Sequence, residues 1–131
     1  MTDTATNTLD LKQISESYFA AWAARDPDAV VAFHTADTQF WTHLGTPPVT
    51  GHDAMRTAVA ELFDRFPEFA FEIYRVFYGP DHWVLDWALI SGDIRFDSLD
   101  VVHLTPDGLI DRKDTFIDMV QLQTALERVD Q

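Results

Sequence analysis

The order of patterns along the chain predicts an α+β domain, with helices packed on one face of a strongly curved antiparallel β-sheet. Apolar residues recur at helical spacing in the first half, and the second half consists of strand-like segments separated by Gly and Asp turns. The 131 residues are enough for one domain with one hydrophobic core. We therefore expect a single domain at residues 9–131, preceded by a disordered tail at residues 1–8.

The first two helices are expected close together at the start of this domain. The apolar stripe of the first helix consists of Leu11, Ile14, Tyr18, Ala21 and Trp22. Asp26 and Pro27 are typical of a helix N-cap and the first helical position, so a second, short helix should run to about His34. A short strand is expected next, at 39–44.

A third helix should begin near His52 and end at Pro67. The rest of the chain is rich in aromatic and β-branched residues, and it is expected to form an antiparallel meander followed by a helix after Asp118. The strands of the meander are expected at 69–78, 82–91, 94–104 and 109–117. Asp107 and Gly108, between the last two strands, are a strong hairpin signal.

The strand expected at 82–91 is apolar on both of its faces. One face carries Trp83, Leu85, Trp87 and Leu89, and the other carries Val84, Ala88 and Ile90. Helices can cover one face of the sheet, and the opposite face then needs a partner. This pattern predicts a homodimer formed through the sheet.

The composition excludes several classes of protein. A net charge of −13 disfavours binding to nucleic acid or to an anionic membrane surface. The absence of Cys excludes disulfides, thiol nucleophiles and Cys-based metal sites. No metal-ligand spacing or phosphate-binding loop is present, so we expect neither a metal nor a cofactor. No segment is long and apolar enough to span a bilayer, and the N-terminus lacks a basic region, so a cytoplasmic location is expected.

Asp100 is the most informative candidate for chemistry. In the strand at 94–104, the alternation of side chains puts Asp100 on the same face as Phe96 and Val102. An unpaired carboxylate on an apolar face is costly, and a protonated acid is one way to avoid that cost. A neutral acid in an apolar cavity could donate a hydrogen bond to a developing oxyanion. The alternatives are an Asp at the cavity rim, or one paired with a buried cation or hydroxyl.

Three further polar residues could serve the same pocket. Tyr18 could supply a second donor beside Asp100, although a buried tyrosine is more often a core residue. His43 follows the first strand and could act as general acid or base near neutral pH, or be an ordinary half-exposed histidine. Asp86 raises the same question as Asp100, on a face that lines the pocket or else meets solvent or a dimer partner.

Two stretches carry a resemblance to a known family. Residues 17–51, SYFAAWAARDPDAVVAFHTADTQFWTHLGTPPVTG, and residues 99–118, LDVVHLTPDGLIDRKDTFID, resemble the opening and the closing hairpin of SnoaL-like and ketosteroid-isomerase-like proteins of the nuclear transport factor 2 superfamily. The resemblance covers nearly the whole chain. It implies an NTF2-like cone of three helices over a strongly bent sheet, which encloses one apolar pocket and is usually dimeric. This superfold hosts isomerases, dehydratases, cyclases, epoxide hydrolases and non-enzymes.

The resemblance also implies roles for single residues. Tyr18 and Asp100 fall where ketosteroid isomerases carry the tyrosine and the protonated aspartic acid of their oxyanion hole. Thr42 falls where those enzymes carry their proton-shuttling aspartate, which argues against efficient steroid isomerase activity. The similarity to limonene epoxide hydrolases places Trp41 and His43 on the pocket side, but the water-activating carboxylates and arginine of that family have no intact counterpart here.

Either alignment turns alternate residues of the last strand toward the pocket. There Lys113 would pair with Asp100 and keep it ionised, against the neutral-acid hypothesis. A bulge in this strand is possible. The expected substrate contacts are Trp22, Trp41, Thr42, Phe63, Asp86, Val102, Lys113, Thr115 and Ile117.

Together these observations favour a cofactor-independent enzyme of isomerase or lyase type that acts on an apolar cyclic molecule of polyketide, terpenoid or steroid character. The reaction would be an isomerisation, dehydration, hydration or cyclisation through an oxyanion or enol-like intermediate. Tyr18 and Asp100 would stabilise charge, and His43 would move a proton. The alternative is a non-catalytic small-molecule-binding or assembly domain of the same fold. Convergence of the three side chains on one pocket would favour the enzyme.

Overall fold

The computed structural model describes residues 9–129, so the expected tail at residues 1–8 lies outside the described residues. The helices are α2 (Leu11–Ala23), α3 (Pro27–Val31), α4 (His52–Arg65) and α5 (Met119–Val129). The strands are β1 (His34–Trp41), β2 (Val49–Thr50), β3 (Phe69–Tyr78), β4 (His82–Ser91), β5 (Ile94–Leu104) and β6 (Ile110–Ile117). The predicted α+β class and the order of its main elements are confirmed.

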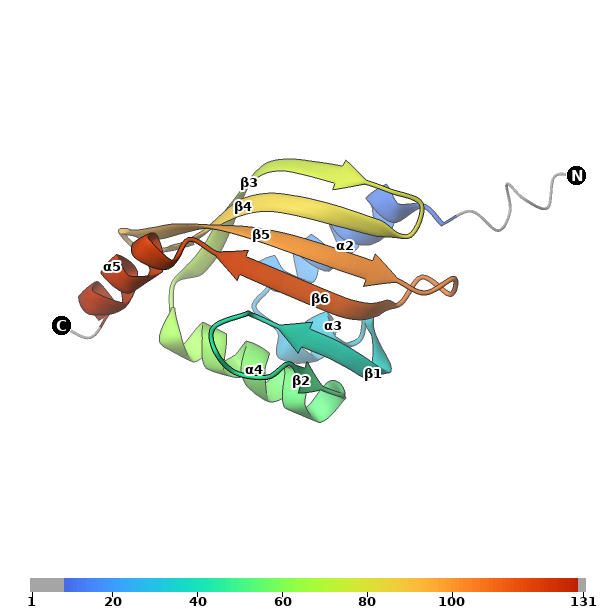
Figure 1. The fold of residues 1–131 in the computed structure, drawn as a ribbon, viewed down its shortest axis with the longest axis horizontal. Helices are drawn as coiled ribbons and strands as arrows, with labels where there is room; N and C mark the ends of the chain where they lie inside the picture. Colours follow the sequence, from blue (N-terminus) through green and yellow to red (C-terminus); the bar gives the residue numbers. More distant parts are fainter. Residues whose placement is uncertain (1–8, 130–131) are drawn as a thin grey trace, which may run out of the picture.

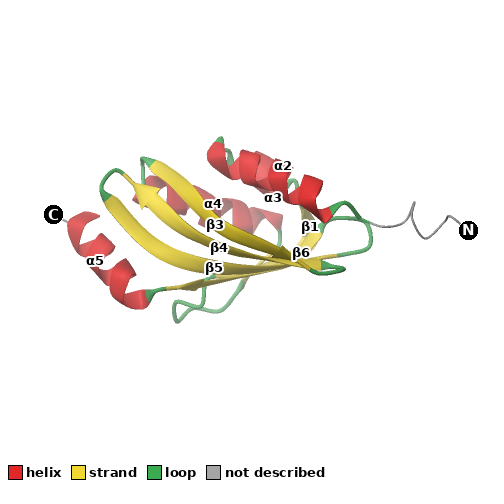
Figure 2. Cartoon of the chain, turned by 90° about the horizontal axis from the view of Figure 1, so that it is seen from above, coloured by secondary structure: helices red, strands yellow, loops and turns green. Residues whose placement is uncertain are grey.

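A curved sheet forms one layer, and helices α2, α3 and α4 cover one of its faces (Figures 1 and 2). The fourth helix, α5, lies at the end of the sheet where β6 finishes (Figure 1). Hydrogen bonds hold α5 there, because the Gln121 side chain accepts from the backbone N–H of Asp97 at 2.7 Å. Throughout residues 9–129, every helix is too short or too polar to cross a membrane.

The strand order is β2-β1-β6-β5-β4-β3. All neighbouring pairs are antiparallel except β1 and β6, which are parallel. The expectation of an antiparallel sheet therefore holds for the long meander and is corrected at this one pair. The parallel pair joins the N-terminal strand to the end of the meander, so residues more than seventy positions apart, such as Phe40 and Lys113, become neighbours.

The helix starts follow local rules. Asp10 caps α2 by accepting from the backbone N–H of Gln13 at 3.0 Å. Asp26 caps α3 in the same way, and Pro27 is its first residue, as predicted. The N-cap of α4 is Gly51 with φ of 91°, a conformation that a side chain would strain.

The first strand is where the sequence prediction needs correction. β1 begins at His34, where the second helix was expected to end, and it stops at Trp41 instead of residue 44. It stops there because His43 has a φ of 56°, which turns the chain out of the extended conformation. The two-residue strand β2 was not predicted at all. Starting β1 at His34 brings that side chain into the core, where it is 2% exposed.

The core lies between the helices and the covered face of the sheet. Tyr18 and Trp22 enter it from α2, and Met55 and Val59 enter it from α4. Trp83, completely buried, enters it from β4. The helical stripes found in the sequence thus mark the faces that are buried.

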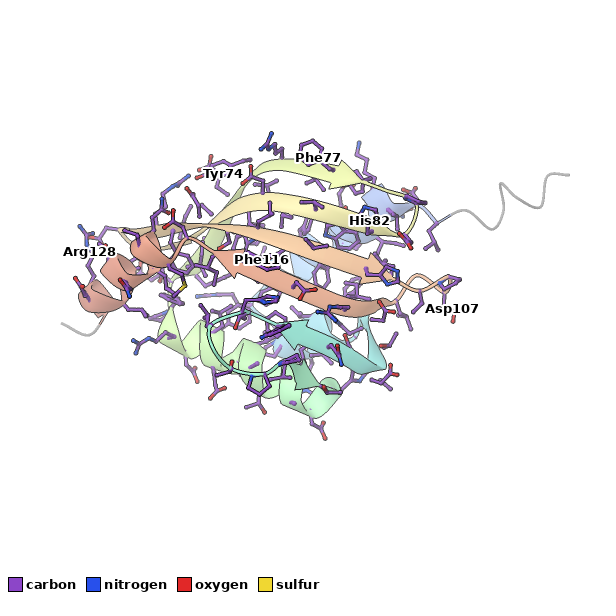
Figure 3. The ribbon with its side chains drawn as sticks, in the orientation of Figure 1. Tyr74, Phe77, His82, Asp107, Phe116 and Arg128 are labelled. Carbon is purple, nitrogen blue, oxygen red and sulfur yellow. The ribbon has the colours of Figure 1, made fainter. Side chains whose placement is uncertain are left out.

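The opposite face of the sheet, here called the outer face, carries exposed apolar side chains. Leu99 of β5 and Phe116 of β6 are register partners, and they are 38% and 44% exposed. Figure 3 shows Phe116 on the face turned away from α2, α3 and α4. Val84 and Ile90 of β4 face the same way by alternation and are half-buried. The homodimer through the sheet is a proposal based on this face.

We expect Phe116→Glu to weaken this dimer at least tenfold, because a carboxylate would be buried against apolar side chains. Analytical ultracentrifugation should show the unmodified chain at twice its 15.0 kDa mass and the variant nearer to 15.0 kDa at micromolar concentration. Val120→Glu is the control, since Val120 is 75% exposed and belongs to helix α5 and not to the sheet. A monomer in the unmodified chain would rule out the proposed dimer.

Candidate active site

A cavity lies between the helices and the covered face of the sheet. Its apolar lining consists of Phe19, Trp22, Phe40, Leu62, Phe69, Phe71, Leu85, Trp87, Leu89, Phe96 and Ile117. Its polar lining consists of Tyr18, Thr42, Ser98, Asp100, Lys113 and Thr115. The space open to the centre of a water-sized sphere is about 70 Å³. The cavity therefore has room for several water molecules or for a small ligand.

Two neighbouring strands bring a cation and an anion together at the wall of this cavity. Asp100 of β5 is 2% exposed and Lys113 of β6 is 4% exposed. Lys113 Nζ lies 3.5 Å from Asp100 Oδ2, and Thr115 Oγ1 donates to Asp100 Oδ1 at 2.8 Å. The register of β5 and β6 produces this arrangement, because Asp100 pairs with Thr115 and Val102 pairs with Lys113. The pairing with a buried cation, one of the alternatives considered for Asp100, is thus what the structure contains.

A bulge in β6 turns Lys113 inward. Leu104 pairs with Ile110, but His103 pairs with Arg112, so one extra residue is inserted at Asp111. Strict alternation from the buried Ile110 would have put Arg112 inside. The bulge instead puts Arg112 outside and Lys113 inside, together with Thr115 two residues further on.

Aromatic rings surround the ammonium of Lys113. Its Nζ lies 4.3 Å from the ring centre of Trp22, 5.1 Å from that of Tyr18 and 5.8 Å from that of Phe40. It also donates to Tyr18 Oη at 3.4 Å. Burial lowers the pKa of Lys113, but the Tyr18 oxygen and the Asp100 carboxylate raise it by more, so the net pKa lies above its ordinary value. Lys113 is therefore a cation at neutral pH, with three N–H groups and two of them directed to Tyr18 and Asp100.

A chain of hydrogen bonds runs from Tyr18 into the core. Tyr18 Oη lies 2.9 Å from His34 Nε2, and His34 Nδ1 lies 2.9 Å from Thr38 Oγ1. Thr38 Oγ1 donates to the carbonyl oxygen of Ile110 at 3.3 Å. One placement of protons satisfies all these contacts: Thr38 donates to Ile110, His34 Nδ1–H donates to Thr38, and Tyr18 donates to His34 Nε2.

The charge states of Tyr18 and His34 agree with this placement. Burial, with the nearby positive charge of Lys113, lowers the pKa of His34 to about 3, so the imidazole is neutral and one of its nitrogens accepts. Burial also raises the pKa of the Tyr18 hydroxyl, and Lys113 offsets this only in part. The hydroxyl proton of Tyr18 is therefore directed at His34 and away from the cavity.

This geometry changes the roles expected for the two oxyanion-hole candidates. Tyr18 and Asp100 do line one cavity, as predicted, but the proton of Tyr18 is already used. Asp100 accepts from Thr115 and pairs with Lys113, which is not the arrangement expected of a neutral donor. Lys113, by contrast, keeps an uncommitted N–H, and sequence reasoning had included it among the substrate contacts.

His43 does not join these residues. Its ring is stacked between Trp41, at 3.9 Å, and Phe116, at 4.3 Å. Its Nε2 lies 2.7 Å from Asp114 Oδ1, and Arg112 binds the same carboxylate. Burial raises the pKa of Asp114, but hydrogen bonds from Arg112 and His43 lower it by more, so the net pKa is lowered. The structure thus corrects the expectation that His43 shares a pocket with Tyr18 and Asp100.

Four other expected contacts also lie away from the cavity lining. Trp41 donates its indole N–H to the carbonyl oxygen of Thr46 at 2.7 Å. Asp86 faces outward and accepts from Arg75 at 2.9 Å. Phe63 packs behind the lining against Trp22, and Val102 is fully buried in the core. The remaining expected contacts, Trp22, Thr42, Lys113, Thr115 and Ile117, do line the cavity.

Sequence reasoning missed His34 as part of this network. It was assigned to the end of a helix, and no special role was given to it. The parity of β1 could have revealed it, because His34, Thr38, Phe40 and Thr42 are separated by even numbers of residues and share one face of an extended chain. Among residues 9–129, no three His, Asp or Glu side chains are arranged to hold a metal ion.

Comparisons with known proteins identify the family and the fold to which this architecture is similar. The family model described as SnoaL-like domain matches residues 15–113. No curated protein is significantly similar in sequence. One similar solved structure is that of SalBIII, an epoxide hydrolase/cyclase-like enzyme with a role in pyran ring formation in the polyether salinomycin. Its sequence is 23% identical to this chain, and the TM-score is 0.74. The match covers 92% of this chain and 97% of that chain.

Two bacterial structures give the same result. A SnoaL-like protein of unknown function from Burkholderia thailandensis is 18% identical with a TM-score of 0.73, covering 85% of this chain and 98% of that one. A protein from Catenulispora acidiphila with a ketosteroid isomerase-like fold, in complex with trimethylamine, is 15% identical with a TM-score of 0.75, covering 87% and 92%. Identities this low show a shared fold, which is the expected nuclear transport factor 2-like cone.

We expect the free energy of unfolding to fall by about 2 kcal/mol between pH 7 and pH 5 because of His34 alone. Its pKa is about 3 in the folded protein, whereas the ordinary pKa of a histidine is 6.5. Below pH 6.5 the unfolded chain therefore binds a proton that the folded chain refuses, and stability decreases until the pH reaches about 3. Urea unfolding at the two pH values measures the difference.

His34→Gln should abolish this dependence, because glutamine can still donate to Thr38 and accept from Tyr18 but does not titrate. His103→Gln is the control, since His103 is largely exposed and its pKa is raised mainly by its hydrogen bond to Asp111. The same loss of stability in the His34→Gln variant would contradict the assignment.

Proposed function

This chain belongs to the SnoaL-like domain family, and from that premise we propose that it is an enzyme that transfers a proton on a small, largely apolar carbonyl compound. Lys113 binds the oxygen on which negative charge develops, and Asp100 takes a proton from the adjacent carbon. The proposed class covers isomerisation, dehydration, hydration and cyclisation through an enol-like intermediate, without a cofactor.

The observation that carries this proposal is the buried ion pair in an otherwise apolar cavity. At the 3.5 Å separation of Lys113 Nζ and Asp100 Oδ2, the attraction is about 5 kcal/mol at an effective dielectric constant of about 20. Desolvation costs several kcal/mol for each ion, so the pair adds little to stability. A buried ionisable group with a shifted pKa beside a charge partner in a cavity, as Lys113 is, marks a candidate functional site.

The proposed chemistry follows from the hydrogen-bond donors and acceptors of Lys113 and Asp100 that are not used within the protein. Lys113 has a third N–H available for a ligand oxygen, and that hydrogen bond strengthens as the oxygen becomes an enolate. Asp100 keeps free lone pairs after accepting from Thr115 and pairing with Lys113. The proton moves from carbon to the carboxylate, and the electron pair moves onto the oxygen. Return of the proton to another carbon isomerises the ligand, and loss of a leaving group instead dehydrates it.

The cavity also limits the ligand. Because the charges of Lys113 and Asp100 cancel, the site favours a neutral molecule whose charge develops only during the reaction. The lining is mostly apolar, so the ligand should be mostly apolar as well. Thr42 also stands at the position where the resemblance implies the base of steroid isomerases, and it cannot take that role.

A non-catalytic binding domain is the second candidate. One observation favours it: Tyr18, His34 and Thr38 satisfy one another, and Asp100 accepts from Thr115 and pairs with Lys113, so these particular groups do not depend on a ligand for their partners. This candidate predicts binding at Lys113 without proton transfer at carbon. The following two experiments separate the candidates.

We expect 4-nitrophenol to bind beside Lys113 and to be roughly ten- to a thousandfold more acidic when bound than when free, because a cation within a few ångströms stabilises the phenolate. The absorbance of the phenolate during a pH titration measures this. Lys113→Met should abolish the effect, and Lys12→Met is the matched control, since these are the two lysines of the chain and Lys12 is exposed. The double variant Lys113→Met, Asp100→Asn removes the pair without leaving an unpaired charge. No binding by the unmodified chain would refute both candidates.

We also expect the protein to catalyse exchange of the α-hydrogens of cyclohexanone in D₂O, followed by NMR. Asp100→Asn should slow the exchange by about 10²–10⁴-fold, since it removes the base and keeps the shape. His43→Gln should leave the rate unchanged, because His43 is outside the cavity. Binding of 4-nitrophenol without any exchange by the unmodified chain would establish the non-catalytic candidate.

A further inference from the structure

We propose that Trp87 and Ser98 form a second polar subsite in the cavity, which binds an acceptor oxygen at the far end of the ligand from Lys113. This inference rests on the proposed function for the first contact, at Lys113. It adds that the ligand carries two oxygen functions at opposite ends of a small apolar body.

The two residues come together by the register of the central strands. Trp87 of β4 and Ser98 of β5 are direct partners in the antiparallel pair. Partners in such a pair lie side by side on the same face of the sheet. Both residues line the cavity, so that face is the covered one.

Neither polar atom has a partner within residues 9–129. Trp87 Nε1 and Ser98 Oγ are both buried and make no hydrogen bond to the described part of the chain. Buried polar atoms without a partner are rare in folded proteins. Here two of them belong to residues that are adjacent in the sheet and that both line the cavity.

Other buried serines of this chain do not share this state. Ser15 Oγ donates to the carbonyl oxygen of Lys12 and contacts Tyr78 Oη at 2.7 Å. Ser91 Oγ accepts from the backbone N–H of Glu68 at 3.1 Å. Trp83 Nε1 also lacks a partner among the described residues, but Trp83 does not line the cavity. Trp22 Nε1 also lacks a partner among the described residues, and Trp22 lines the cavity, but it belongs to α2, whereas Trp87 and Ser98 are direct partners in the sheet.

The position of the subsite sets the distance between the two oxygens of the ligand. Ser98 precedes Asp100 by two residues on the same face of β5, a rise of about 6.8 Å. Lys113 lies beside Asp100, so the two subsites are separated by about the length of one substituted six-membered ring. The indole N–H can only donate and the hydroxyl can donate, so the second group is an acceptor such as a carbonyl, ether or nitro oxygen.

The test compares two phenols of similar size. 4-Hydroxybenzaldehyde has a phenolic oxygen for Lys113 and a carbonyl oxygen at the opposite end, whereas 4-methylphenol has a methyl group there. We expect Ser98→Ala and Trp87→Phe each to weaken binding of 4-hydroxybenzaldehyde by about three- to tenfold, the effect of one lost hydrogen bond. Binding of 4-methylphenol should change less than twofold. Isothermal titration calorimetry measures the affinity of both phenols for the unmodified chain and the two variants. For each phenol, the affinity of a variant is compared with that of the unmodified chain, so the different acidities of the two phenols do not enter the comparison.

The stability of Ser98→Ala gives a second readout. A hydroxyl kept for the ligand contributes nothing to the fold, so the thermal midpoint of the variant should equal or exceed that of the unmodified chain. A lower midpoint, or equal effects of the variants on both phenols, would overturn the subsite and leave the proposed function standing. Failure of both phenols to bind the unmodified chain would overturn the proposed function and the subsite together.

Discussion

The buried ammonium of Lys113 is the group around which the rest of the site is arranged. A lysine that is 4% exposed needs compensation for the water it loses, and three kinds of neighbour supply it. Asp100 supplies the opposite charge, Tyr18 supplies an acceptor oxygen, and the face of the Trp22 ring supplies the negative side of its quadrupole. Each of these neighbours is in turn held by the fold.

Burial and the positive charge of Lys113 together determine the protonation and the hydrogen bonding of Tyr18, His34 and Thr38. With the ammonium on one side, Tyr18 turns its proton toward His34, and His34 stays neutral because it is buried and because a second cation near Lys113 is unfavourable. Thr38 ends this chain of hydrogen bonds by donating to the backbone carbonyl oxygen of Ile110. A polar network in a dry core is stable when every member is satisfied, and this one is satisfied up to Lys113. The unused N–H of Lys113 is therefore the point at which the network can respond to a ligand.

The cavity combines this polar wall with aromatic and aliphatic surroundings. An apolar cavity strengthens electrostatic interactions, because little water screens them. The wall is nevertheless neutral overall, since Lys113 and Asp100 balance each other. A site of this kind suits a ligand that enters uncharged and develops charge at one oxygen. The unpartnered Trp87 and Ser98 extend the polar character along the covered face of the central strands.

The sequence by itself determined the fold class, the N-cap of α3 and the side-chain parity within most elements. Tyr18 and Asp100 could be placed in one cavity because a helical stripe and a strand alternation are properties of a single segment. The limits of β1 were not predicted, since they depend on a left-handed residue at His43 and on pairing with β6, and for that reason His34 and His43 were misplaced. The roles of Lys113 and Tyr18 were also decided by tertiary structure. A bulge and the register between strands far apart in the chain choose the partner of a buried polar group, and local periodicity carries no information about that partner.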